Sequence, residues 1–327
     1  MKNRSCYWDN LKGILILLVV IAHFMQCGDI SLTVYNAIYL FHMPLFIYVS
    51  GLFHNNENIK QRLLGLLLIG VVYNAALILV DNVILKTEQE FYILRATKIP
   101  WFVLTLAMCA AATYVLKDCN RRVVLGISLF LAIIACYDKN LMQYMALAKF
   151  IGWFPFYYLG ANSNFNDIET KFTKVHIRVL GGVGVIAYII SVIMCRNSSL
   201  NISRGSFLFG VQNVFPTMSI KWVGVKIGYY LLVVVISMAV MSSTPHKNIP
   251  LLTYVGRKTM PIYFWHIIIR SFAFYTGVQN YFYASFWGNI AWTIISVAMA
   301  LILTLKPFEF PTRNILEGVK NRVNYKD

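Results

Sequence analysis

The stretch GILILLVVIAHFMQ, residues 13–26, decides the fold class because it is apolar almost throughout and lies in a segment long enough to cross a bilayer. Similar runs recur along the chain between short polar breaks, and 58% of the residues are hydrophobic while only 13% are charged. In lipid the backbone must form its hydrogen bonds within helices or a closed barrel. The runs lack the alternation of barrel strands. We therefore predict an all-α polytopic membrane protein.

The apolar runs predict about ten transmembrane helices in a single domain covering residues 1–327, with no soluble domain. About two thirds of the Lys and Arg residues fall in the N-terminus, the C-terminus and the loops expected on their side, so we expect both termini in the cytoplasm. No small-x-small cleavage site follows the first run, which we interpret as a permanent helix. The expected spans are 11–27, 34–53, 63–85, 101–116, 123–137, 144–161, 179–195, 226–241, 259–275 and 286–305.

The net charge of +16 does not indicate a nucleic-acid partner. Most basic residues lie in the predicted loops, where they set orientation and contact anionic lipid head groups, so the lipid bilayer is the expected partner. The six cysteines form neither a CxxC motif nor a cluster with histidine. We therefore expect no metal site and no disulfide framework.

Two polar residues share one face of the first predicted helix. Lys12 and His23 are eleven residues apart, so on an α-helix they differ by about 20° around the axis and by about 16.5 Å along it. An imidazole within a span is a candidate functional group, although it can also be a hydrogen bond between helices. Lys12 alone is also typical of a topology signal. Asp9 lies near the same face, where it can support the site or pair with Lys12 or another base at the inner face.

Two further histidines fall within predicted spans. His42 starts the second span at the depth expected for His23, and it is either part of the same site or an interfacial polar residue. His266 lies mid-span with Arg270 one turn further on, which makes them neighbours on the helix surface. This pair is a candidate acceptor-site or support group, or a structural polar pair near the boundary.

Several motifs occur together in chain order and resemble those of the acyltransferase-3 family of membrane O-acyltransferases, with most similarity to the fucose 4-O-acetylase-like branch. The first helix carries a basic residue and a histidine separated by ten residues, as the family does. The motifs are Arg4-x-x-x-Trp8-Asp9-Asn10-Leu11-Lys12-Gly13, His23, Phe41-His42-Met43-Pro44-Leu45-Phe46, Ser50-Gly51, Trp101-Phe102, Phe154-Pro155-Phe156 with Gly160, and Tyr263-x-x-His266.

The resemblance implies transfer of an acetyl group from acetyl-CoA, a co-substrate rather than a bound cofactor, to a sugar hydroxyl of a surface polysaccharide or lipid-linked glycan. It also implies the inner membrane of a bacterium. His23 would be the general base, and His42 would orient it or donate to the oxyanion. Ser50 and Trp101 are possible acceptor or support residues.

Lys12, Lys60 and Arg62 would attract the phosphates of the donor. Many relatives begin the third helix with Arg-x-x-Arg, whereas this chain has Lys60-Gln61-Arg62. The alternative function is a transporter or flippase for a polar lipid-linked or anionic solute, which would also need basic residues and histidines in the membrane.

Overall fold

A computed structural model describes residues 5–25, 29–86, 100–137, 141, 147–195 and 219–324. Within these ranges the chain is helical and contains no strand, as the sequence predicts. Each of the ten predicted spans coincides with a helix, whereas the number of crossings and the side of the termini stay predictions. The chain divides into two compact units, one built from Met1–Phe46, Asn164–Phe209 and Gly224–Phe308 and the other from Ile47–Ser163, Gly210–Val223 and Glu309–Asp327.

The first unit contains most of the longer helices. They are α1 (Cys6–Phe24), the first part of α2 (Asp29–Leu52), α7 (Phe165–Phe172), α8 (Val175–Cys195), most of α10 (Ile220–Ser243), α11 (Pro250–Arg257), α12 (Thr259–Thr276), α13 (Gln279–Tyr283) and α14 (Phe286–Ile302).

The second unit holds the remaining helices. They are the end of α2, α3 (Ile59–Leu79), which a π-helical turn extends over Val80–Ile84, α4 (Trp101–Val115), α5 (Arg121–Ile134), α6 (Leu147–Ala161) and α15 (Thr312–Asn324).

Four helices in the described residues are long and apolar enough to cross a membrane. They are Cys6–Phe24, Ile59–Ile84, Val175–Met194 and Ile220–Ser243. Most hydrophobic side chains of Val175–Cys195 are exposed, which suits a helix whose solvent is lipid rather than water. Together these helices make the chain an integral membrane protein.

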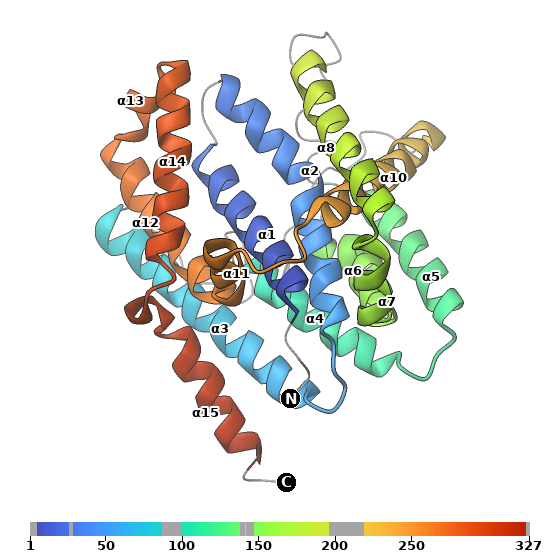
Figure 1. Cartoon of the computed structure of the whole chain (residues 1–327). Helices are drawn as coiled ribbons and strands as arrows, with labels where there is room; N and C mark the ends of the chain where they lie inside the picture. The colour runs from blue at the N-terminus through green and yellow to red at the C-terminus, as the bar shows by residue number, and fades with distance from the viewer. Residues whose placement is uncertain are drawn as a thin grey trace. The chain divides into compact units, whose positions relative to one another are not determined.

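In the first unit, α1 is the central helix. It packs against α11, α12 and α14, which lie around it in Figure 1. The large apolar side chains of α1 are accordingly buried, including Tyr7, Trp8, Leu11 and Leu15. A helix that is covered on several sides presents its few polar groups to protein, which is where an intramembrane histidine can be accommodated.

Glycines allow α1 and α11 to cross with their backbones in contact. A Cβ atom on Gly256 would collide with the backbone carbonyl of Asp9, and one on Gly13 would lie 2.5 Å from the Leu252 carbonyl oxygen. Each helix therefore contributes a glycine at the point where the other helix approaches. Small residues at such crossings let membrane helices pack closely.

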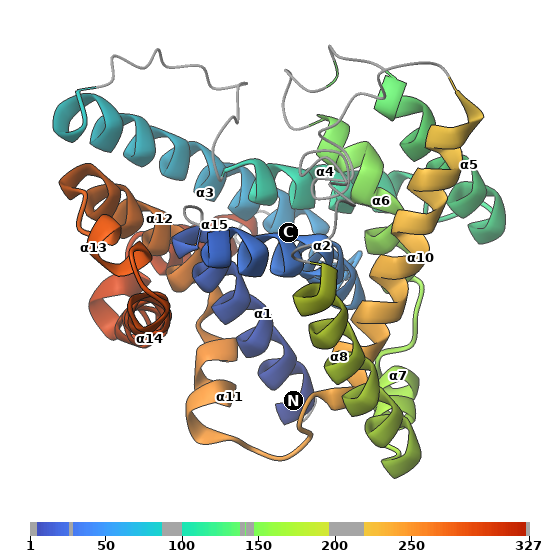
Figure 2. The same ribbon diagram turned by 90° about the horizontal axis from the view of Figure 1, so that it is seen from above.

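In the second unit, α3, α4, α6 and α5 follow one another in contact, and Figure 2 shows this row. The C-terminal helix α15 packs on α3. A second reciprocal crossing joins the end of α2 to α6, because a Cβ on Gly51 would meet the Tyr157 carbonyl and one on Gly160 would meet the Tyr48 carbonyl. Gly51 and Gly160 thus let the backbones of α2 and α6 approach closely.

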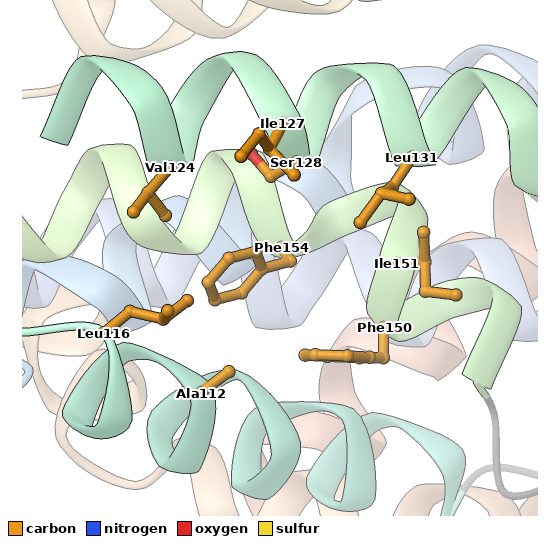
Figure 3. Close-up of a pocket in the computed structure, with 9 residues that line it drawn as sticks. All are labelled: Ala112, Leu116, Val124, Ile127, Ser128, Leu131, Phe150, Ile151 and Phe154. Atoms are coloured by element: carbon orange, nitrogen blue, oxygen red, sulfur yellow. The ribbon is translucent and has the colours of Figure 1, made fainter. Parts of the chain in front are cut away.

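Residues of α4, α5 and α6, together with Leu116 at the end of α4, line an open apolar pocket of about 220 Å³. Figure 3 shows Phe150 and Phe154 of α6 facing aliphatic side chains of α5 across it. Ser128 is the one polar residue among the nine described side chains that line the pocket. The Ser128 hydroxyl donates to the Leu125 carbonyl, and none of the nine lining residues can act as a base for it, so the candidate site lies elsewhere.

The crossing of α1 and α11 generates a prediction. We expect Gly256→Ala to destabilise the protein by about 1–3 kcal/mol, because the added methyl must push the two backbones apart. Thermal unfolding of the detergent-solubilised protein measures this. Gly228→Ala in α10 is the matched control, since its Cβ would meet no atom within 4 Å. Equal midpoints for the two variants would contradict the role of Gly256.

Candidate functional site

Three histidines from different parts of the sequence meet in the first unit. His23 lies near the end of α1, with its ring centroid 5.3 Å from that of His266 in α12. His42, in α2, joins them through Tyr39, which contacts both His23 and His42. The sequence predicted His23 and His42 at one depth and His266 as a separate candidate, and the fold brings the three into one cluster.

Tyr39 of α2 joins two of these histidines. Its hydroxyl lies 3.2 Å from Nδ1 and 3.2 Å from Nε2 of His23, and its ring centroid is 4.8 Å from that of His42. The ring centroid of Tyr35 lies 4.1 Å from that of Tyr39, with the two rings tilted. A tyrosine hydroxyl can donate to a neutral imidazole or accept from a protonated one, so Tyr39 can serve both states of His23.

The end of α1 is held through its backbone. Nε of Arg270 donates to the carbonyl of His23 at 2.6 Å, and Nε1 of Trp292 donates to the carbonyl of Phe24 at 3.0 Å. The hydroxyl of Tyr283 donates to the same Phe24 carbonyl. The last carbonyls of a helix lack partners within the helix. Donors from α12, α13 and α14 supply them here and thereby fix where His23 sits.

Arg270 therefore has a role that sequence spacing did not indicate. It was predicted as a neighbour of His266 on the helix surface, and it also binds the backbone at His23. Its guanidinium carbon lies 4.0 Å from the centroid of the Phe274 ring, which holds the side chain over its own helix. The residue links α12 to α1 at the histidine cluster.

His42 and His266 are each fixed by their own helix. Nδ1 of His42 lies 2.7 Å from the carbonyl oxygen of Ile38, and Nδ1 of His266 lies 2.9 Å from that of Ile262. Both side chains are fully buried. Their Nε2 atoms have no hydrogen-bond partner among the described residues. No set of three or more potential ligands in those residues is arranged to hold a metal ion.

The opposite end of α1 carries a buried ion-pair network. Asp9 is only 1% exposed, and its carboxylate pairs with Lys12 at 2.9 Å and with Arg257 of α11 at 3.1 Å. Asn10 beside it donates to two backbone carbonyls and accepts from Thr253 at 2.6 Å. Asp9 pairs with bases, as one of the two sequence interpretations predicted.

The basic residues at the start of α3 lie in the second unit. Lys60 is exposed, whereas Arg62 donates to the carbonyls of Phe53 at 2.8 Å and Ser50 at 3.0 Å. These two bonds satisfy the C-terminal end of α2. Arg62 also lies 5.8 Å from the ring centroid of Tyr157. Ser50 and Arg62 are thus close together, in contact through a main-chain carbonyl.

Trp101 lies among aromatic and basic groups of the same unit. Its ring centroid is 5.1 Å from that of Trp153, and Nζ of Lys149 lies 4.7 Å from the Trp101 ring centroid. This is a cation–π contact.

Three residues of interest were not identified from the sequence. Tyr39 lies one turn before His42 on the same helix face, a spacing that could have indicated it. Lys226 is a buried lysine within an apolar run, 5.4 and 5.1 Å from the ring centroids of Tyr229 and Tyr230, and an ionisable intramembrane residue is itself a signal. Arg257 could be found only from the packing of α11 on α1.

Comparison with known proteins agrees with the family resemblance. The model of the acyltransferase-3 family, described as an acyltransferase domain, matches residues 7–305. The chain belongs to the acyltransferase-3 family. It is also similar to the nodulation protein NolL of Sinorhizobium fredii (strain NBRC 101917 / NGR234), at 46% identity over 56 residues, which cover 15% of this chain and 15% of that protein. No solved structure matches the chain.

Residues 7–305 therefore form an acyltransferase domain of this family. The matched residues include α1 with Lys12 and His23 and continue through α14, so both ends of α1 and the whole histidine cluster lie within the acyltransferase domain. The short match to NolL supports the family as a whole and carries no argument for one branch of it.

The Asp9 network generates a second prediction. We expect Asp9→Asn to lower the free energy of unfolding by roughly 1–3 kcal/mol, because it removes both ion pairs of a buried carboxylate whose partners are partly exposed. Glu317→Gln is the matched control, since its pair with Arg313 is exposed on both sides and its loss costs about 0–1 kcal/mol. Chemical denaturation of both variants measures the difference, and equal losses would contradict the prediction.

His54, in the loop after α2, generates a prediction on pH. Burial lowers the pKa of His54 below its ordinary value of 6.5; the hydrogen bond to Asn56 opposes this, and the Arg62 charge lowers it further. Below pH 6.5 the unfolded chain therefore binds a proton at His54 more readily than the folded chain does. The neutral His54 contributes to the free energy of unfolding in full above pH 6.5. That contribution is lost as the pH falls from 6.5 towards the pKa of His54 in the folded chain.

We expect the unfolding temperature to fall less between pH 7.5 and 5 in His54→Gln than in the wild type. The exposed His246→Gln is the control and should follow the wild type. If the unfolding temperature of His54→Gln fell with pH as steeply as that of the wild type, His54 would not be the source of this pH dependence.

Proposed function

We propose that this acyltransferase moves an acetyl group from acetyl-CoA to a hydroxyl of a carbohydrate on a surface polysaccharide or lipid-linked glycan, in the inner membrane of a bacterium. The hydroxyl oxygen attacks the thioester carbonyl carbon, a C–O bond forms and the C–S bond breaks. The hydroxyl proton passes to His23 and then to the departing thiolate, so the products are an O-acetyl ester and free CoA.

One observation carries the proposal. His23 lies beside His266 and within hydrogen-bond distance of Tyr39, in a protein whose family is that of acyltransferases. Acyl transfer to a hydroxyl needs a base at the reacting oxygen. The backbone contacts from Arg270 and Trp292 hold that base in place, and rigid support of the reacting group favours catalysis.

The neighbours of His23 have distinct proposed roles. Tyr39 orients the imidazole and stabilises its protonated form by accepting a hydrogen bond from it. His42 supports the site through its contact with Tyr39. Of the two roles expected for His42, donation to an oxyanion fits less well, because Nδ1–H of a neutral His42 already binds the Ile38 carbonyl.

The donor phosphates are proposed to bind at the basic end of α1. Lys12 is about 16.5 Å from His23 along the helix, a distance that the extended pantetheine arm of CoA can span. Asp9 aligns Lys12 with Arg257, which adds a second cation in the same unit. Lys60 and Arg62 stay candidates for donor binding, and the remaining guanidinium donors of Arg62 are available for an anion.

Substitution of His23 tests the proposal. In purified protein reconstituted into lipid, we expect His23→Ala to lower acetyl transfer by at least about a hundredfold, because the reaction loses its base. Release of free CoA together with acetyl incorporation into cell-envelope glycan measures it. The exposed His246→Ala is the control.

Wild-type activity in a folded His23→Ala protein would overturn the assignment of the base. Glycan transport without thioester consumption by the wild type would instead favour the transporter or flippase.

A further inference from the structure

The two buried histidines beside His23 have a defined hydrogen-bonding state. A backbone carbonyl can only accept, so the contacts to Ile38 and Ile262 require a proton on Nδ1 of both His42 and His266. In a neutral imidazole the other nitrogen then carries a lone pair. Nε2 of each residue is therefore an acceptor.

Burial favours this neutral form. His42 and His266 are both 0% exposed, and a buried charge needs a compensating partner. Arg270 lies on the next turn from His266, and its charge repels a second positive charge there. The surroundings of His42 and His266 therefore favour two neutral imidazoles, each with a lone pair on Nε2.

Neither lone pair is used within the part of the chain that the structure describes. A buried acceptor without a partner costs about 1–3 kcal/mol. His266 lies beside His23, and His42 lies against Tyr39, which contacts His23. A ligand bound for reaction can therefore supply the missing donors. The chemistry required is a donor that is neutral, because Arg270 would repel an ammonium group and an anionic phosphate has only acceptors.

We infer that His42 and His266 recognise the acyl acceptor by accepting hydrogen bonds from hydroxyl groups that neighbour the one acylated. The acceptor is therefore a polyol with at least one free hydroxyl beside the reacting hydroxyl, and an alcohol with a single hydroxyl is a poor substrate. This inference rests on the proposed function, because it assumes that a hydroxyl reacts at His23.

Acceptor analogues test the inference. A panel of methyl glycosides is first screened with acetyl-CoA and reconstituted wild-type protein, and the monodeoxy analogues of the best acceptor are then compared with it. We expect removal of a neighbouring hydroxyl to lower wild-type kcat/KM roughly ten- to a hundredfold, since it leaves a buried acceptor unpaired.

The variants His42→Leu and His266→Leu should each lose the discrimination against one deoxy analogue. For that analogue, the ratio of kcat/KM for the parent glycoside to kcat/KM for the deoxy glycoside should be near one. His42→Gln and His266→Gln carry a side-chain oxygen that can accept, and they should restore part of it. His246→Leu, at an exposed position, should discriminate as the wild type does. A merely structural role would lower activity towards every acceptor equally and leave the ratios unchanged.

Unchanged ratios in both leucine variants would overturn the inference while leaving acetyl transfer standing. Failure of the wild type to acylate any glycoside or cell-envelope glycan would overturn the proposed function and the inference together.

Nitrogen-15 NMR of histidine-labelled wild type needs no variant. Two unprotonated Nε2 resonances that shift when the glycoside is added are expected, and protonated Nε2 in every histidine would also overturn the inference.

Discussion

The capping of the last carbonyls of α1 is the interaction on which the candidate site depends. The donors come from Arg270, Tyr283 and Trp292, which belong to three consecutive helices. In lipid an unpaired carbonyl costs several kcal/mol, so the end of α1 must be paired by protein. The three donors meet this need and place His23 against α12. The hydrogen bonds that pair these main-chain carbonyls thus also fix the position of His23, the proposed base.

The two ends of α1 are held by different kinds of contact. At the start, Asp9 binds two cations and Gly256 lets the α11 backbone approach. At the other end, hydrogen bonds to main-chain carbonyls replace ion pairs. Most of the helix between is buried, which gives α1 a rigid connection between its basic end and its histidine cluster. Such rigidity suits a reaction in which donor and base must be held at a set separation.

Helical periodicity was sufficient to predict that Lys12 and His23 lie on one helix, and the continuous helix Cys6–Phe24 confirms this. Equal depth made a site shared by His23 and His42 one of two predictions. The sequence could not predict that His266 joins them, because that depends on how α12 packs against α1. Hydropathy predicted a helix at every expected span, but it does not establish how many of them cross the membrane. The partners of Asp9 were half predicted, since Lys12 is one turn away while Arg257 is distant in sequence.

The anchorage of His23 uses its main-chain oxygen and leaves the imidazole out of the bond to Arg270. The main chain of His23 thus fixes its position, while the imidazole would supply its proposed chemistry, so a substitution can remove one and keep the other. A truncated side chain would leave the helix end in place and open a space the size of the missing ring. Small imidazoles or pyridines added from solution could enter that space, so chemical complementation can distinguish a lost base from a lost fold.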